Sequence, residues 1–185
     1  MLRKQGYTII DADQIAREIV QSGKPALDRI RAHFGNDIID DTGSLDRRAL
    51  GRIVFSDADA KKALENITHP AIFAETQSLL AHWEKTLPKT ALVFYENALL
   101  FETGTHSYCD TVVAVTATEE TQKQRLQSRD PDLSVQECED RISSQWPAAK
   151  KADLADYVIH NNGSVDELLH AVQDCLTTLE KNTDG

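Results

Sequence analysis

The chain has 185 residues, of which 41% are hydrophobic, and a formal net charge of −10 at pH 7. This length is typical of one domain, and the apolar content is sufficient for a core, which excludes wholesale disorder. The acidic balance argues against a general nucleic-acid surface, although local Arg and Lys side chains can still line a cleft for a small anion.

Cysteine usage and hydropathy indicate the compartment. Cys109, Cys138 and Cys175 are far apart and form no C-x-x-C pair, so we expect neither a disulfide framework nor a zinc site. A reducing cytoplasm fits best. The N-terminus has no apolar signal region, and no apolar run approaches the ~18 residues of a membrane span, so we expect no membrane partner.

Short apolar runs in chain order predict buried strands at residues 7–11, 91–95, 111–116 and 157–160. Helical spacing with start and stop signals predicts helices at 13–23, 25–35, 47–55, 57–67, 70–86, 118–130, 134–145 and 164–181, with a polar tail at 182–185. Residues 36–46 form a turn-rich connector. Strands that alternate with helices predict an α/β fold with a parallel sheet and helices on both faces.

Two carboxylates, Asp11 and Asp13, follow the first predicted strand in the stretch "DAD". Ligands of parallel sheets bind at the carboxyl ends of strands, where Asp13 could accept a proton from a hydroxyl or orient it. Plain helix capping is the alternative, and spacing alone favours it. Arg17 lies one turn later and either pairs with Asp13 or holds a phosphate.

His69 directly precedes Pro70 in "NITHPAIFAE", at the expected start of a helix. Free N–H groups at a helix N-terminus favour an anion. An N-cap or an ordinary surface histidine is the alternative, and the sequence alone favours it.

Basic side chains gather in one third of the acidic chain, where Arg125 and Arg129 share a helical face and Arg141, Lys150 and Lys151 follow. Such a segment could close over phosphates and exclude water. A charged, solvated helical hairpin is the alternative.

The phosphate-binding loop G-x-x-x-x-G-K-[ST] is absent from the 185 residues. The single Gly-Lys pair, Gly23-Lys24, follows a predicted helix and precedes Pro25, so we expect a turn there and no phosphate-binding loop. H-E-x-x-H, G-x-S-x-G and G-x-G-x-x-G are also absent.

Several ordered stretches together resemble the dephospho-CoA kinases, which carry out the last step of coenzyme A biosynthesis. The stretches are "IIDADQIAREIV", "FGNDIIDDTGSLDRRALGRIVF", "ITHPAI", "ALLFE", "QRLQSRD", "RISSQ" and "ADYVIHNNGS". The resemblance runs almost end to end, with Ala98 where the family usually has proline.

The resemblance implies transfer of the γ-phosphoryl group of ATP to the ribose 3′-hydroxyl of dephospho-CoA, with Mg²⁺ between the β- and γ-oxygens. It assigns Asp13 as the general base or orienting group. It places Asp11, Arg17, His69 and Glu102 in the acceptor site. It implies ATP as a co-substrate, no resident cofactor and no protein metal site.

The resemblance also assigns residues to the ATP side of the site and to a helical lid. Arg125 and Arg129 would contact ATP phosphates. Arg141, Gln145 and Lys151 are further lid candidates, and the family often has arginine near position 151. Asn161 and Asn162 would lie near the adenine.

The fold that the resemblance implies is a three-layer P-loop-kinase-like parallel sheet in a single domain, residues 1–185. Its core would comprise residues 1–22, 88–122 and 152–181. Residues 23–87 would form a helical acceptor-binding insert, and residues 123–151 the lid. We expect a monomer or weak oligomer.

The family begins with a strand, the phosphate-binding loop and a helix, whereas "MLRKQGY" resembles the last turn of that helix. The resemblance therefore predicts that a central strand, between those starting near Ala91 and Thr111, and the loop are missing, about 20 residues in all. An upstream start, a broken gene and a non-catalytic relative would each explain this, and we expect the first. We expect no kinase activity from residues 1–185 alone. The alternatives are a non-catalytic CoA- or nucleotide-binding relative and another small-molecule P-loop kinase.

Overall fold

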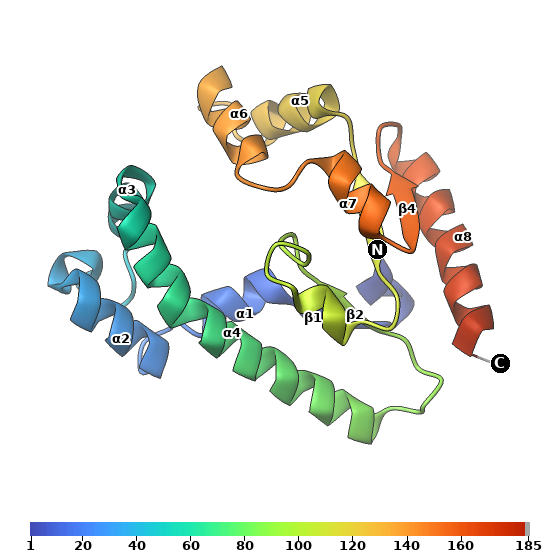
Figure 1. Ribbon diagram of the computed structural model, residues 1–185, viewed down its shortest axis with the longest axis horizontal. Coiled ribbons are helices and arrows are strands. Elements are labelled where there is room, and N and C mark those ends of the chain that lie inside the picture. Colours follow the sequence, from blue (N-terminus) through green and yellow to red (C-terminus); the bar gives the residue numbers. More distant parts are fainter. Residues whose placement is uncertain (184–185) are drawn as a thin grey trace. The chain divides into compact units, whose positions relative to one another are not determined.

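The structure, a computed structural model, describes residues 1–183 and divides into two compact units (Figure 1). We call residues 2–97 the N-terminal unit and residues 98–183, with which Met1 clusters, the C-terminal unit. Each unit contains one pair of parallel strands. The α/β fold with parallel strands that the sequence predicts is therefore confirmed, while the single-domain boundaries and the three layers stay predictions.

The N-terminal unit contains two strands and four α-helices. In chain order its elements are η1 Leu2–Gln5, β1 Thr8–Asp11, α1 Ala12–Glu18, α2 Pro25–Phe34, η2 Asn36–Ile38, α3 Arg47–Ser56, α4 Ala58–Thr86 and β2 Val93–Glu96. The connector predicted at 36–46 holds η2 and an isolated antiparallel bridge between Ile39 and Leu45.

The C-terminal unit contains the other strand pair and four α-helices. Its elements are η3 Thr105–Tyr108, β3 Val113–Thr116, α5 Glu119–Arg129, α6 Val135–Ser143, α7 Ala148–Leu154, β4 Tyr157–His160 and α8 Val165–Thr183. The sequence analysis missed α7, although Pro147 followed by Ala and Lys residues is a helix-start signal. In the predicted polar tail, Asn182 and Thr183 belong to α8, and Asp184 and Gly185 lie outside the described residues.

The predicted start and stop signals act as expected in α2, and a cap that the sequence analysis did not name begins α3. Pro25 stands at the first position of α2, and Gly35 ends this helix with a φ of 90°, a left-handed conformation that favours glycine. The side chain of Asp46 caps α3 by accepting from the N–H groups of Arg48 and Ala49. Helix α1 differs from prediction, because it ends at Glu18 and Gly23 lies in a later turn.

The prediction of two helices around His69 is wrong. Residues 58–86 form one helix, α4, with Pro70 inside it. Pro70 lacks an N–H and weakens the helix locally, but α4 packs on α1, α2 and α3, and this packing offsets the loss. His69 consequently lies exposed in mid-helix, so the anion site expected from a helix N-terminus does not form there.

The strand pairs are parallel and in register, with Thr8 opposite Val93 in β1–β2 and Val113 opposite Tyr157 in β3–β4. The strands predicted from 91 and 111 begin two residues later. The N–H of Ala91 bonds to the carbonyl of Pro88 in a turn, and the N–H of Val112 bonds to the Asp156 carboxylate. Within residues 1–183, β2 and β3 belong to separate two-stranded sheets. The predicted missing strand stays a prediction.

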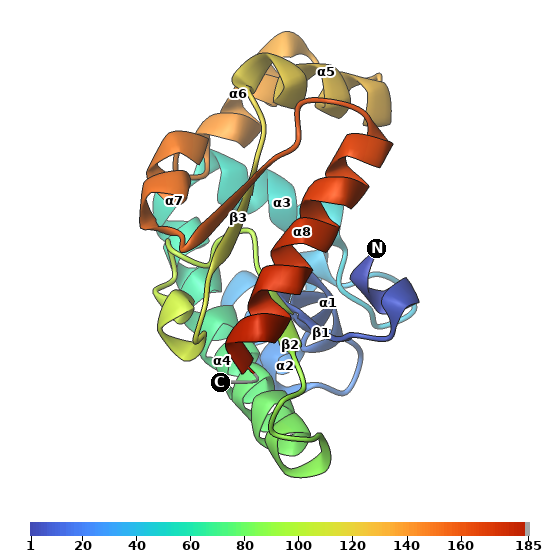
Figure 2. The same cartoon turned by 90° about the vertical axis from the view of Figure 1, so that its right-hand side faces the viewer.

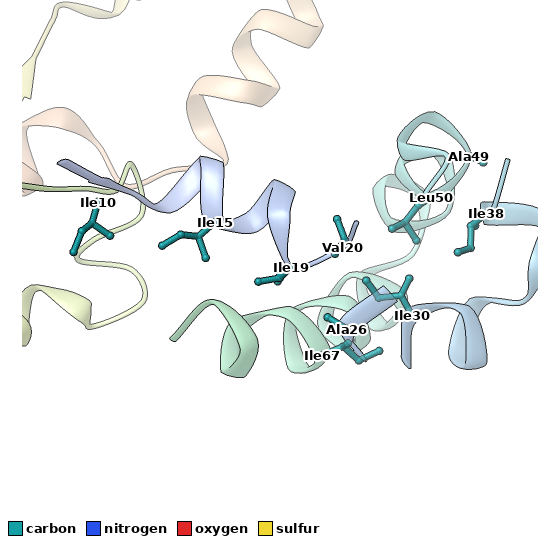
Figure 3. Close-up of a cluster of buried hydrophobic side chains, with 10 residues drawn as sticks. All are labelled: Ile10, Ile15, Ile19, Val20, Ala26, Ile30, Ile38, Ala49, Leu50 and Ile67. Atoms are coloured by element: carbon teal, nitrogen blue, oxygen red, sulfur yellow. The ribbon is translucent and has the colours of Figure 1, made fainter. Parts of the chain in front are cut away.

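An apolar cluster forms the core of the N-terminal unit (Figure 3). Ile15 and Ile19 lie on the side of α1 that faces α4. The cluster comprises Ile10, Ile15, Ile19, Val20, Ala26, Ile30, Ile38, Ala49, Leu50 and Ile67. These side chains come from β1, from helices α1 to α4, from η2 and from the turn after α1. Burial of the cluster therefore orients α1, which carries Asp13 and Arg17.

Helix α8 covers β4 in the C-terminal unit, and Figure 2 shows it running alongside this strand. Ile159, Leu176 and Leu179 are buried there. Within residues 1–183, no helix has the length and apolar composition that crossing a membrane requires.

Candidate functional site

The junction of β1 and α1 carries the two aspartates of "DAD" in different roles. An Asp11 oxygen accepts from the N–H of Gln14 at 2.9 Å, which caps α1, and the other oxygen lies 3.5 Å from an Arg3 nitrogen. Asp13 stands in the first turn of α1 and is exposed. Within residues 1–183 no hydrogen bond or ion pair engages its carboxylate. Asp11 therefore supports the helix, and Asp13 is available to a ligand.

Arg17 holds its guanidinium beside Asp13 through the main chain. Its Nε donates to the carbonyl oxygen of Asp13 at 3.1 Å. Arg47 donates in turn to the carbonyl oxygen of Arg17, at 3.5 Å. Because Nε alone is engaged among residues 1–183, the terminal nitrogens of Arg17 remain able to bind an anion next to the Asp13 carboxylate.

A cavity of about 200 Å³ in the N-terminal unit lies against α1, the helix that carries Asp13 and Arg17. Its lining is mostly aliphatic, from helices α1 to α4 and the connector before α3, and includes Arg47 and Thr68. His69 follows Thr68 on α4, and α4 packs on α1. The predicted acceptor residues Asp13, Arg17 and His69 thus come from two helices that are in contact.

Glu102 and Lys151 meet in the C-terminal unit. Lys151 Nζ lies 2.9 Å from Glu102 Oε1, 2.7 Å from the Ala98 carbonyl oxygen and 3.2 Å from Gln145 Oε1. Glu102 Oε1 also accepts from the N–H of Trp146 at 2.8 Å. The structure therefore brings Glu102, predicted for the acceptor site, together with two predicted lid residues.

The pKa of Glu102 reflects this environment. Burial opposes ionisation and raises the pKa, but the hydrogen bonds from Lys151 and from the Trp146 N–H outweigh it. The pKa of Glu102 is held below its usual value, so the carboxylate is ionised at neutral pH.

Arg125 is bound to the turn after β4. Its two terminal nitrogens donate to the carbonyl oxygens of Asn161 and Gly163, at 2.7 and 3.2 Å. Asn162 Oδ1 accepts from the N–H of Thr118 at 2.7 Å. The structure thus places the predicted phosphate contact Arg125 beside the two asparagines predicted near adenine.

The other predicted lid arginines lie apart from this turn. Arg129 is exposed at the end of α5, and among residues 1–183 nothing pairs with it. Arg141 lies 3.7 Å from the Asp130 carboxylate in an exposed ion pair. Arg129 is consequently the predicted lid cation that is best placed to accept a new anion.

Comparison with known proteins identifies the family of the chain. The family model described as dephospho-CoA kinase matches residues 1–167. The chain belongs to the dephospho-CoA kinase family. The resemblance seen in the sequence is thereby confirmed.

Relatives in this family cover most of the chain. The dephospho-CoA kinase of Syntrophotalea carbinolica is 41% identical over 167 residues, 90% of this chain and 78% of the relative. That of Bdellovibrio bacteriovorus is 40% identical over 181 residues, 98% of this chain and 88% of the relative. Among solved structures, the dephospho-CoA kinase from Campylobacter jejuni is 29% identical with a TM-score of 0.71, over 97% of this chain and 88% of its own. A Thermus thermophilus protein is 34% identical with a TM-score of 0.75, over 96% and 87% of the two chains.

Sequence reasoning missed the main-chain groups that complete these clusters. The Trp146 N–H and the Ala98 carbonyl bind the Glu102–Lys151 pair, and the Asn161 and Gly163 carbonyls bind Arg125. No spacing rule links these positions, because each contact joins segments far apart in the chain.

Proposed function

We propose that the chain acts in the transfer of the γ-phosphoryl group of ATP to the ribose 3′-hydroxyl of dephospho-CoA. The observation that carries this proposal is the match of residues 1–167 to the dephospho-CoA kinase family. Another small-molecule P-loop kinase activity is the alternative that a panel of nucleosides and nucleotides would reveal.

Asp13 is our proposed general base or orienting group. Its carboxylate is exposed in the first turn of α1 and engages no other group among residues 1–183. It would accept the proton of the 3′-hydroxyl as the oxygen bonds to the γ-phosphorus and ADP departs. This availability of the carboxylate supports Asp13 over Asp11, whose oxygens are used in capping and by Arg3.

Arg17 and His69 are proposed acceptor contacts on the two packed helices α1 and α4. Arg17 offers its terminal nitrogens to a phosphate of dephospho-CoA. The aliphatic cavity beside α1 suits an apolar part of the acceptor. Asp11 would contribute by holding the start of α1 in place.

On the nucleotide side, Arg125, Arg129 and Arg141 are proposed phosphate contacts, and Asn161 and Asn162 are proposed neighbours of the adenine. Arg129 is the most available of the three arginines. Among the described residues no three His, Cys, Asp or Glu side chains gather as a metal site. We propose that Mg²⁺ enters with ATP as part of the co-substrate. The free thiols of Cys109, Cys138 and Cys175 support the cytoplasm as the proposed compartment.

The 185 residues contain no G-x-x-x-x-G-K-[ST] loop, whose N–H groups and lysine would hold the phosphates. We therefore propose that residues 1–185 need a phosphate-binding segment from outside this sequence for turnover. The same observation favours a second candidate function, namely binding of CoA-type ligands without turnover.

The test is to measure CoA formation from dephospho-CoA and Mg-ATP with two proteins. One is the 185-residue chain, and the other, here called the hybrid, is this chain preceded by a strand, a G-x-x-x-x-G-K-[ST] loop and a helix, the segment that the family resemblance predicts. We expect turnover from the hybrid alone. Turnover by residues 1–185 would refute the need for the added segment.

A substitution then tests Asp13. In the hybrid, Asp13→Asn should lower kcat by about 10² to 10⁴-fold, the usual contribution of a general base. Asp59→Asn, an exposed aspartate in the first turn of α4, is the matched control and should leave kcat unchanged. Equal rates for both variants would remove Asp13 from the mechanism. The non-catalytic candidate would be favoured if calorimetry showed binding of dephospho-CoA while neither the 185-residue chain nor the hybrid turned it over.

A further inference from the structure

Lys151 uses its whole hydrogen-bonding capacity inside the C-terminal unit. A lysine ammonium group has three N–H donors and no acceptor. Lys151 Nζ has three acceptors, namely Glu102 Oε1 at 2.9 Å, the Ala98 carbonyl at 2.7 Å and Gln145 Oε1 at 3.2 Å. No donor is left for a ligand while these contacts persist.

The pair that Lys151 forms with Glu102 is also the most buried ion pair among the described residues. Its side chains are 17% and 14% exposed, whereas those of the Arg141–Asp130 pair are 50% and 43% exposed. A charge at such a depth is tolerated only when it is paired, so each partner depends on the other. The second oxygen of Glu102 is buried and accepts from nothing among residues 1–183, so this carboxylate relies on one oxygen for its contacts.

The contacts join two segments that are distant in sequence. Ala98 and Glu102 belong to the turn that follows β2 in the chain. Gln145 and Trp146 lie in the loop between α6 and α7, and Lys151 lies on α7. Glu102 Oε1 takes both the Lys151 ammonium and the Trp146 N–H, so one oxygen holds both the loop and the helix.

We infer that Lys151 is a positioning residue. With Glu102 it forms a buried ion pair, here called the tether, that holds the α6–α7 loop and α7 of the lid against the turn at 98–102. Lys151 then orients the lid segment and leaves the binding of ATP phosphates to the arginines proposed above, of which Arg129 is exposed and unpaired among residues 1–183. The tether is a property of the chain itself, and only its effect on phosphoryl transfer rests on the proposed function.

A role of Lys151 as a phosphate contact would require it to leave Glu102. The carboxylate would then remain buried without its cation and with one oxygen already unpartnered. The neighbouring Lys150 carries no such constraint, because its ammonium stacks on the Trp146 ring, 3.1 Å from the centroid, and its side chain is exposed.

The test follows the exchange of the Trp146 backbone amide by NMR in the 185-residue chain. Lys151→Met removes the cation that holds Glu102 and should accelerate exchange of this amide by about ten-fold or more, as expected for local opening. Lys181→Met makes the same charge change at an exposed position of α8. It is the matched control and should leave the exchange rate within about two-fold. Equal protection in the two variants would overturn the tether.

A second pair of variants keeps the test decisive if Lys151→Met unfolds the chain. Glu102→Gln retains the shape of the side chain and removes its charge, and Lys151→Arg retains the charge. We expect Glu102→Gln to accelerate exchange at Trp146 while the amide of Leu176, in the buried part of α8, keeps its protection. Unchanged exchange at Trp146 in Glu102→Gln would refute the tether. The effects of Glu102→Gln and Lys151→Met should be non-additive in the double variant, and full additivity would also refute it.

The kinetic consequence separates a positioning role from a contact with ATP. In the hybrid that turns over, Lys151→Met and Glu102→Gln should lower kcat by similar factors and leave KM for ATP within about two-fold. A large rise in KM for ATP confined to Lys151→Met would show that Lys151 contacts the nucleotide. Absence of turnover in the hybrid would count against the proposed function and would leave the amide-exchange result standing.

Discussion

The two units of the molecule are organised by different forces. The buried cluster of the N-terminal unit is drawn from β1, helices α1 to α4, η2 and the turn after α1 (Figure 3). The C-terminal unit also buries apolar side chains such as Ile159 and Leu176, but several of its contacts between distant segments are polar. They include the contact of Lys151 with Glu102 and that of Arg125 with the 161–163 turn. Val115 on β3 and Val158 on β4 remain exposed there.

This difference matches the work that we propose for each unit. Apolar burial is non-directional and holds α1 rigidly, which suits the presentation of Asp13. Polar contacts are directional and fix particular groups at defined distances, which suits the tether that we propose for the lid segment. The comparison therefore predicts that substitutions in the two units fail in different ways.

The largest effect should come from the apolar cluster. Ile30 is fully buried, and Ile30→Ala should lower the free energy of unfolding by about 3 kcal/mol, through lost burial and the void that remains. Urea denaturation measures this. Val115→Ala, at a side chain that is 59% exposed, is the control and should change stability by less than about 0.5 kcal/mol. Similar losses in the free energy of unfolding for Ile30→Ala and Val115→Ala would contradict the proposed role of apolar burial in the N-terminal unit.

An intermediate effect should come from the tether. Lys151→Met should lower the free energy of unfolding by about 2 kcal/mol, because it leaves the Glu102 carboxylate buried without its cation. Lys150→Met removes only an exposed cation–π contact and should cost no more than about 0.5–1 kcal/mol. The same denaturation experiment compares them, and a larger loss for Lys150→Met would contradict the proposed difference.

A smaller effect should come from a polar contact inside the apolar unit. Asp46 caps α3 by accepting from two N–H groups at 2.9 Å each. Asp46→Ala should therefore cost about 1 kcal/mol, less than the loss at Ile30. Asp41→Ala, in the exposed connector before α3, should be close to neutral. A larger loss of stability for Asp46→Ala than for Ile30→Ala would contradict the view that apolar burial dominates in this unit.

The smallest effect is the change with pH, near neutrality, of the stability that the ionised Glu102 contributes. The folded-state pKa of this group lies below its ordinary value of 4.5, so its contribution to stability is fully present above that value. The contribution is lost as the pH falls through the lowered folded-state pKa. The stability difference between the parent chain and Glu102→Gln should therefore stay constant from neutral pH down to about pH 5 and shrink at lower pH. Denaturation over a pH series measures it, and a difference that already fell between pH 7 and 6 would place the titration in another group.

Local signals in the sequence predicted much of the fold. The β-branched runs placed all four strands to within two residues, and Pro25 and Gly35 marked helix ends that the structure contains. The prediction failed at Pro70, where packing of α4 on three other helices outweighs the helix-breaking tendency of proline. It also missed α7, a short helix whose Lys151 is held by contacts from outside the helix.

By itself, the sequence determined the order and kind of most elements, the family, and the candidate residues from Asp13 to Asn162, because these depend on local propensity and on motifs in linear order. The tertiary structure alone decided which polar groups are occupied. Asp11 caps a helix while Asp13 stays open, and Lys151 is saturated by Glu102, Ala98 and Gln145 while Arg129 is exposed. The physical reason is that a hydrogen bond depends on the distance and direction between two groups in space, and separation along the chain specifies neither.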